Sequence, residues 1–135
     1  MKEIIKDGVV LARHIFEEDI HEGLNFYSKD EEFIQVGAWS YNEGKDLLAH
    51  IHNEFPRTPT RTCETLYVIS GSLQVTIYDL DENVIDKFEV HKGEILILLE
   101  CGHGYKILEN DTKVLEVKNG PYMGAEKDRY RIGEL

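Results

Sequence analysis

The chain has 135 residues, a formal net charge of −11 at pH 7 and a sequence pI of about 4.9. This length corresponds to one domain and is enough to bury a core without disulfides or a structural metal. The composition, 41% hydrophobic and 30% charged residues, is that of a globular domain. The acidic surface excludes nucleic acid and anionic lipid as expected partners, and an anionic small molecule would need a local cationic pocket.

No apolar run approaches the roughly 20 residues needed to span a bilayer. The N-terminus also lacks the layout of a signal peptide, because acidic residues interrupt its apolar ones. We therefore expect a cytoplasmic protein without membrane contact. Its two cysteines, Cys63 and Cys101, are expected to be free thiols that behave as small buried hydrophobic residues.

Most of the chain has the alternating pattern of β-strands. Near the N-terminus only residues 14–22 resemble a short helix, so a short helical or irregular segment is expected there. Strands are expected in the stretches EEFIQVGAWSY, LLAHIH, TLYVISG, SLQVTIYDLD, VIDKFEV, EILILL, YKIL and VLEVK. They recur roughly every 8–12 residues and no helical crossovers separate them, which predicts an all-β sandwich or barrel.

Two histidines and a glutamate stand close together in the stretch HIHNEFPRTPTRTCETLYVISG. Residues i and i+2 of a strand point to one face, so His50 and His52 are expected to project together. Glu64 opens the next strand, and His103 follows EILILL in the turn ECGHG. Three imidazoles and a carboxylate suit one divalent metal such as Fe, Mn, Ni, Co or Zn. Taken singly, each of these residues could instead be structural or exposed.

The order and spacing of these residues resemble the cupin superfamily. The first cupin motif is similar to the series Gly44, His50, His52, Glu64 and Gly71, except that eleven residues separate His52 from Glu64, where the familiar motif has only a few. Residues 93–103 resemble the second motif, although they lack its usual proline and His103 arrives one residue early.

This resemblance implies a double-stranded β-helix, the cupin jelly-roll barrel. The chain would be a single cupin domain over residues 1–135, with a barrel core at about residues 33–118. One divalent metal ion would lie inside a mouth of the barrel. The ligands implied by the resemblance are His50, His52, Glu64 and His103.

Other side chains are candidates for binding or proton transfer. Arg57 and Arg61 lie on the eleven-residue insert of an acidic chain, and guanidinium suits bidentate binding of carboxylate or phosphate. Each arginine could instead pair with a surface acid. Tyr105 is a candidate catalytic residue together with Glu64, or an aromatic plug. Gln35 could hydrogen-bond a ligand inside the barrel.

The last predicted strand leaves one question open, because Glu116 and Lys118 alternate with Leu115 and Val117. If the apolar pair faces a partner, the charged pair faces the cavity.

Two classes of function fit these residues. The first is a metal-dependent enzyme acting on a small anionic or sugar-derived metabolite, either an isomerase, epimerase or lyase or else a dioxygenase. The second is a non-catalytic barrel that binds a metabolite. A homodimer is expected, because pairing would cover the edge strands of a small barrel. The apolar residues expected on faces opposite the ligands are Trp39, Ile51, Tyr67 and Ile69.

Overall fold

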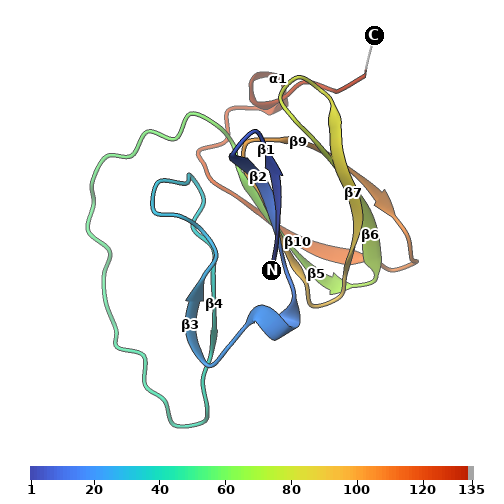
Figure 1. Ribbon diagram of the computed structural model, residues 1–135. Coiled ribbons are helices and arrows are strands. Elements are labelled where there is room, and N and C mark those ends of the chain that lie inside the picture. Colours follow the sequence, from blue (N-terminus) through green and yellow to red (C-terminus); the bar gives the residue numbers. More distant parts are fainter. Residues whose placement is uncertain (134–135) are drawn as a thin grey trace.

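The computed structural model of the protein describes residues 1–133, and Figure 1 shows that it consists mostly of strands. Within these residues the strands are β1 (Lys2–Lys6), β2 (Val9–Ile15), β3 (Gly23–Phe26), β4 (Gly37–Ser40), β5 (Glu64–Ser70), β6 (Ser72–Tyr78), β7 (Val84–His91), β8 (Ile95–Leu98), β9 (Gly102–Ile107) and β10 (Lys113–Lys118). The helices there are a 3-10 turn at Glu17–Asp19 and α1 at Ala125–Asp128. Neither of these helices is long and apolar enough to cross a membrane.

All strand pairs are antiparallel and belong to three sheets. The large sheet has the order β1-β2-β8-β5-β10, the small sheet has the order β7-β6-β9, and β3 and β4 form a separate hairpin. The expected all-β class is confirmed. Over residues 1–133 these sheets do not close into a barrel, so the jelly-roll barrel stays a prediction.

The N-terminal region differs from the sequence-based expectation. A short helical or irregular segment is wrong for residues 2–15, which form the β1–β2 hairpin, and only the 3-10 turn at Glu17–Asp19 matches the expected helix. Asp7 and Gly8 join the two strands with φ angles of 50° and 78°, the left-handed region that an Asp-Gly hairpin turn requires. The packed core therefore includes Ile4, upstream of the expected start at residue 33.

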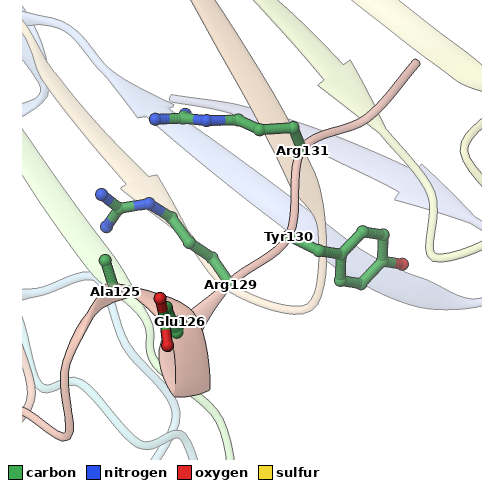
Figure 2. Close-up of a pocket in the computed structure, with 5 residues that line it drawn as sticks. All are labelled: Ala125, Glu126, Arg129, Tyr130 and Arg131. Carbon is green, nitrogen blue, oxygen red and sulfur yellow. The ribbon is translucent and has the colours of Figure 1, made fainter. Parts of the chain in front are cut away.

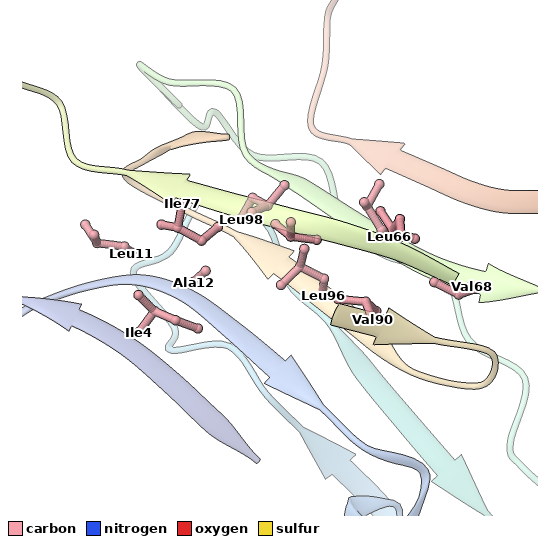
Figure 3. Close-up of a cluster of buried hydrophobic side chains, with 11 residues drawn as sticks. Ile4, Leu11, Ala12, Leu66, Val68, Ile77, Val90, Leu96 and Leu98 are labelled. Atoms are coloured by element: carbon pink, nitrogen blue, oxygen red, sulfur yellow. The ribbon is translucent and has the colours of Figure 1, made fainter. Parts of the chain in front are cut away.

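The large and small sheets pack face to face around the main core (Figure 3). On β6, Leu73, Val75 and Ile77 point inward and are at most 2% exposed, as their alternation predicts. Val68 of β5 and Leu96 of β8 meet them from the large sheet, and both are fully buried. Burial of each such side chain contributes about 1.5–3 kcal/mol to folding, so this contact holds the two sheets together.

A second apolar cluster lies on the opposite face of the large sheet. Residues 20–36, which we call the covering layer, contribute several of its side chains. This layer includes β3 and covers β2 and β8, and the chain continues from it into β4 and the segment that follows. The cluster consists of Ile15, Ile34, Cys63, Ile95, Ile97 and Leu99, with Val10, Ile20, Tyr27 and Val36 at its margin.

Residues 39–61, the exposed segment, lie outside both layers. Every residue in this segment is exposed, and Figure 1 shows it as a wide cyan-to-green arc that leaves the sheets. The structure has no strand between β4 and β5, so the strand predicted for LLAHIH is not formed. The strand predicted for EEFIQVGAWSY is reduced to Gly37–Ser40. The six later strands of the prediction are present as β5 to β10.

Gly71 joins β5 to β6, and the structure predicts that a side chain at this position would destabilise the fold. Its φ is 77°, and a Cβ there would overlap the side chain of Thr112 and lie 2.8 Å from the Thr112 Cα. We expect Gly71→Ala to lower the free energy of unfolding by about 2 kcal/mol, from left-handed strain plus overlap. Urea unfolding measures this loss. Gly8 has a φ of 78° with nothing near its missing Cβ, so Gly8→Ala should lose only about 1 kcal/mol. Equal losses in both variants would contradict a role for Thr112.

Candidate functional site

Glu64 is the first residue of β5, in the large sheet. Across the large sheet it pairs with Leu98 of β8 and Lys118 of β10. It shares the inward face with Leu66 and Val68, because alternate residues of a strand point the same way. Only 7% of Glu64 is exposed, so its carboxylate requires partners inside the protein.

Three side chains surround this carboxylate, and we call the four residues the Glu64 cluster. His103 Nε2 lies 2.9 Å from Glu64 Oε2, and Lys118 Nζ lies 3.2 Å from Glu64 Oε1. The Tyr105 hydroxyl donates to Glu64 Oε2 over 3.4 Å. His103 and Tyr105 belong to β9 of the small sheet, whereas Lys118 belongs to β10 of the large sheet. The cluster therefore connects the two sheets with charged and polar groups.

Glu64 is held as an anion by its neighbours. Burial alone would raise the pKa of its carboxyl group, but the hydrogen bonds and charges of His103 and Lys118 outweigh burial and lower that pKa to about 2. For Lys118 burial acts the other way and lowers the pKa of the ammonium group. The hydrogen bond and charge of Glu64 and the charge of Glu116 raise that pKa by more. Glu64 and Lys118 are therefore both charged at neutral pH.

Tyr105 and His103 are the cluster members whose side chains can both donate and accept a proton. Burial of its hydroxyl end raises the pKa of Tyr105, and the charges of Glu64 and Glu116 raise it further, so the phenol stays protonated. Because a carboxylate only accepts, His103 Nε2 carries the proton of its bond to Glu64. In the neutral ring the lone pair is then on Nδ1, which is buried and has no hydrogen-bond partner among the described residues.

The predicted metal ligands are only partly brought together. Glu64 and His103 are in contact, as the resemblance implies, but His50 and His52 lie on the exposed segment with ring centroids 4.9 Å apart. Among residues 1–133 no three metal-ligating side chains are gathered around one point. The Lys118 ammonium against Glu64 also disfavours a cation there. The residues as folded in one chain do not fit a metal ion, and the four-ligand set stays a prediction that requires the exposed segment to move.

The predicted ligand-binding residues lie outside the Glu64 cluster. Arg57 stacks on Phe55 within the exposed segment, with its guanidinium carbon 3.9 Å from the ring centroid. Arg61 is exposed at the end of the same segment. Gln35 does not face the space between the sheets, since it is exposed and its amide donates to the carbonyls of Lys29 and Glu32, both at 2.9 Å. Gln35 therefore closes a turn over residues 29–32 and is not part of a strand.

Lys118 is the cluster member to which sequence reasoning assigns no role. The alternation of β10 correctly groups it with Glu116, and the structure turns this charged pair toward Glu64 while Leu115 and Val117 are about half exposed on the other face. The pairing of Lys118 with Glu64 across the sheet could not be read from the alternation, because register depends on which strands become neighbours.

Two further arginines, also absent from the sequence-based candidates, lie in the C-terminal tail. Figure 2 shows Arg129 and Arg131 extending in a similar direction from a shallow hollow of about 210 Å³. Arg129 is close enough for its charge to act on Lys118, and Asp128 beside it bonds to Thr62 near the start of β5. The tail therefore brings positive charge to the region of the cluster. The hollow is lined by Ala125, Glu126, Arg129, Tyr130 and Arg131.

The cysteines are free, as predicted. Cys63 is buried and Cys101 is half-buried just before β9. Burial raises the pKa of both thiols, that of Cys101 to about 12, so neither is a thiolate at neutral pH. Thiolate chemistry is therefore not part of this site.

Comparison with known proteins does not place the chain in a family. No family model matches it, and neither the curated proteins nor the solved structures include a match. The cupin resemblance therefore stays a prediction from motif spacing, and a functional assignment depends on the Glu64 cluster.

Proposed function

We propose that the protein is an isomerase or epimerase that moves a proton on a carbon next to the carbonyl group of a small, anionic, sugar-derived metabolite. The observation that carries this proposal is the Glu64 cluster. A buried carboxylate fixes an imidazole at 2.9 Å, and a protonated phenol and an ammonium group touch the same carboxylate at 3.4 and 3.2 Å. Acid, base and a stabilising cation are thus available together.

Each cluster member has one role in this reaction. His103, oriented by Glu64, takes the proton from the carbon. Tyr105 donates a proton to the carbonyl oxygen, which forms an enediol, and Lys118 stabilises negative charge that develops on that oxygen. Return of that proton to the neighbouring carbon, while the hydroxyl on the neighbouring carbon gives a proton to Tyr105, gives an isomer. Delivery of a solvent proton to the opposite face of the first carbon, while His103 releases its proton to solvent and the enediol oxygen returns its proton to Tyr105, gives an epimer. Substrate and product have the same atoms, so the step needs no oxidant or reductant.

Positive charge around the cluster supports an anionic substrate. The chain has a net charge of −11, which repels anions at long range, and salt screens this repulsion beyond about 8 Å. At short range Lys118 is part of the cluster, and the charge of Arg129 in the neighbouring tail reaches Lys118. Arg57 and Arg61 remain candidates for the same task if the exposed segment folds over the site.

The proposal is tested by proton exchange with solvent. The purified protein is incubated in D₂O with sugar phosphates, nucleotide-linked keto sugars and keto acids, and loss of a carbon-bound proton signal is followed by NMR. We expect one compound class to exchange. His103→Gln should slow that exchange by a factor of about 100 or more, because a positioned base contributes at least that much.

His91→Gln is the matched control. His91 forms a similar pair with Glu89, at 3.1 Å, but on the exposed surface of β7, so this variant should exchange at the rate of the native protein. Equal rates in the His103 and His91 variants would contradict the assignment of His103. A compound that binds without any exchange would favour the non-catalytic metabolite-binding barrel instead.

A further inference from the structure

The strands that carry the cluster have free edges. β9 pairs only with β6 and β10 only with β5, so each ends its sheet within the described part of the chain. His103 and Tyr105 are on β9, and Lys118 is on β10. A free edge presents a row of unpaired backbone groups, which is a template for another strand. Here the template lies directly beside the candidate site.

Residues 46–53 have the sequence of a strand but lack a strand's partners. No backbone hydrogen bond joins residues 46–60 to any other part of the described chain. Leu47, Leu48 and Ile51 are 48%, 86% and 93% exposed. Unpaired backbone in contact with water is tolerated, but consecutive exposed aliphatic side chains on such a segment mark a surface that becomes covered.

The pattern of this segment matches the edge of β9. His103 and Tyr105 face the same side as the buried Val75 and Ile77 of β6, toward the large sheet. A strand added to the edge would place His50 and His52 on one face and Ala49 and Ile51 on the other. With the imidazoles on the inward side they would stand next to His103, whose Nδ1 is buried without a partner in residues 1–133.

Two observations favour a second copy of the chain as the source of this strand. The exposed segment starts from the covering layer over β2 and β8, and Figure 1 shows it arcing out on the side of the β3–β4 hairpin before it returns to β5. In addition, the outer face of β5 and β10 and the hairpin leave apolar side chains bare. These are Leu24, Phe26, Trp39, Tyr67, Ile69, Leu115 and Val117, each at least 42% exposed. Contact with a second copy would cover these apolar faces and place residues 46–53 of one chain beside β9 of the other.

We propose that residues 46–53 of one chain form a strand on the free edge of β9 in a second copy, so that each candidate site is built from two chains. The exchange is reciprocal, which gives a two-fold symmetric dimer. It supplies the imidazoles of His50 and His52 next to Glu64 and His103. This proposal rests on the proposed function only because both involve the Glu64 cluster.

Cross-linking between different chains tests the exchange directly. One chain carries Ile51→Cys, and a second chain of different mass carries Lys106→Cys on the outward face of β9. The two are unfolded, refolded together and oxidised. Neighbouring strands bring such side chains to about 5 Å, so a covalent heterodimer is expected. Lys87→Cys, on the other edge strand of the small sheet, is the matched control and should give at least about tenfold less product, because it lacks that high local concentration.

The outcomes separate this proposal from the proposed function. A monomer mass by light scattering, or equal heterodimer yields with Lys106→Cys and Lys87→Cys, would overturn the exchange. A chain carrying both Ile51→Cys and Lys106→Cys that forms only an internal disulfide would also overturn it, since the strand would then come from the same chain. None of these results affects proton transfer by His103. Conversely, heterodimer formation without proton exchange on any compound would support the strand and reject the reaction.

Discussion

Arg13→Met should lower the free energy of unfolding by about 3 kcal/mol, because it leaves two carboxylates without their cation in a protected site. Arg13 is 3% exposed although it is charged. Its guanidinium donates to Glu32 Oε1 and Oε2 at 2.5 and 2.9 Å, and to Glu3 Oε2 at 2.9 Å. A further bond of 2.9 Å to the carbonyl of Tyr27 fastens the covering layer to β2. Urea unfolding at pH 7 measures the loss.

An exposed pair provides the comparison. Lys2 and Asp86 are also 2.9 Å apart, but their side chains are 48% and 31% exposed. Lys2→Met should therefore cost no more than about 1 kcal/mol. If Arg13→Met costs no more than Lys2→Met, the covering layer does not depend on the buried guanidinium. The hydrogen-bond energy of Arg13 would then be balanced by its desolvation, as happens for some buried ion pairs.

The strands that alternate most regularly are those that sequence reasoning located. Leu73, Val75 and Ile77 alternate with polar residues along β6, and a strand with one buried face needs that period whatever its neighbours are. The N-terminal hairpin also has a usable signal, since Asp7-Gly8 stands between the apolar residues Ile4-Ile5 and the apolar stretch VVLA. An Asp-Gly turn with flanking apolar residues predicts a hairpin more strongly than the acidic residues that follow predict a helix.

The LLAHIH stretch shows where such reasoning ends. Its alternating sequence predicts which side chains would share a face if a strand formed. The sequence pattern does not show whether a partner strand exists. A strand forms only when another edge accepts its hydrogen bonds, and within one described chain no edge does so. The same limit applies to the site. Spacing makes Glu64, His103 and Tyr105 candidates, but the contact between Glu64 and Lys118 depends on the pairing of β5 with β10.

Glu64→Gln should remove a pH-dependent part of the stability. The folded-state pKa of Glu64 is about 2, compared with an ordinary value of 4.5, because His103 and Lys118 outweigh the effect of burial. Since that pKa is lowered on folding, the stabilisation is fully present above the unfolded pKa and is lost as the pH falls through the folded one. The pH range over which this stabilisation is lost runs from about 4.5 down to about 2. A shift of this size corresponds to about 3 kcal/mol at neutral pH.

The measurement is the difference in unfolding free energy between the native protein and Glu64→Gln at pH 7, 4 and 3. We expect the difference to be close to 3 kcal/mol at pH 7 and to shrink steadily below about pH 4.5, because only the native side chain takes up a proton there. Glu89→Gln, which breaks the exposed pair with His91, should change stability by no more than about 1 kcal/mol at pH 7. A difference for Glu64→Gln that stays constant from pH 7 to pH 3 would show that the carboxylate is not held as an anion by His103 and Lys118. The electrostatic basis of the candidate site would then be wrong, since the imidazole would lack the fixed negative charge that sets its tautomer.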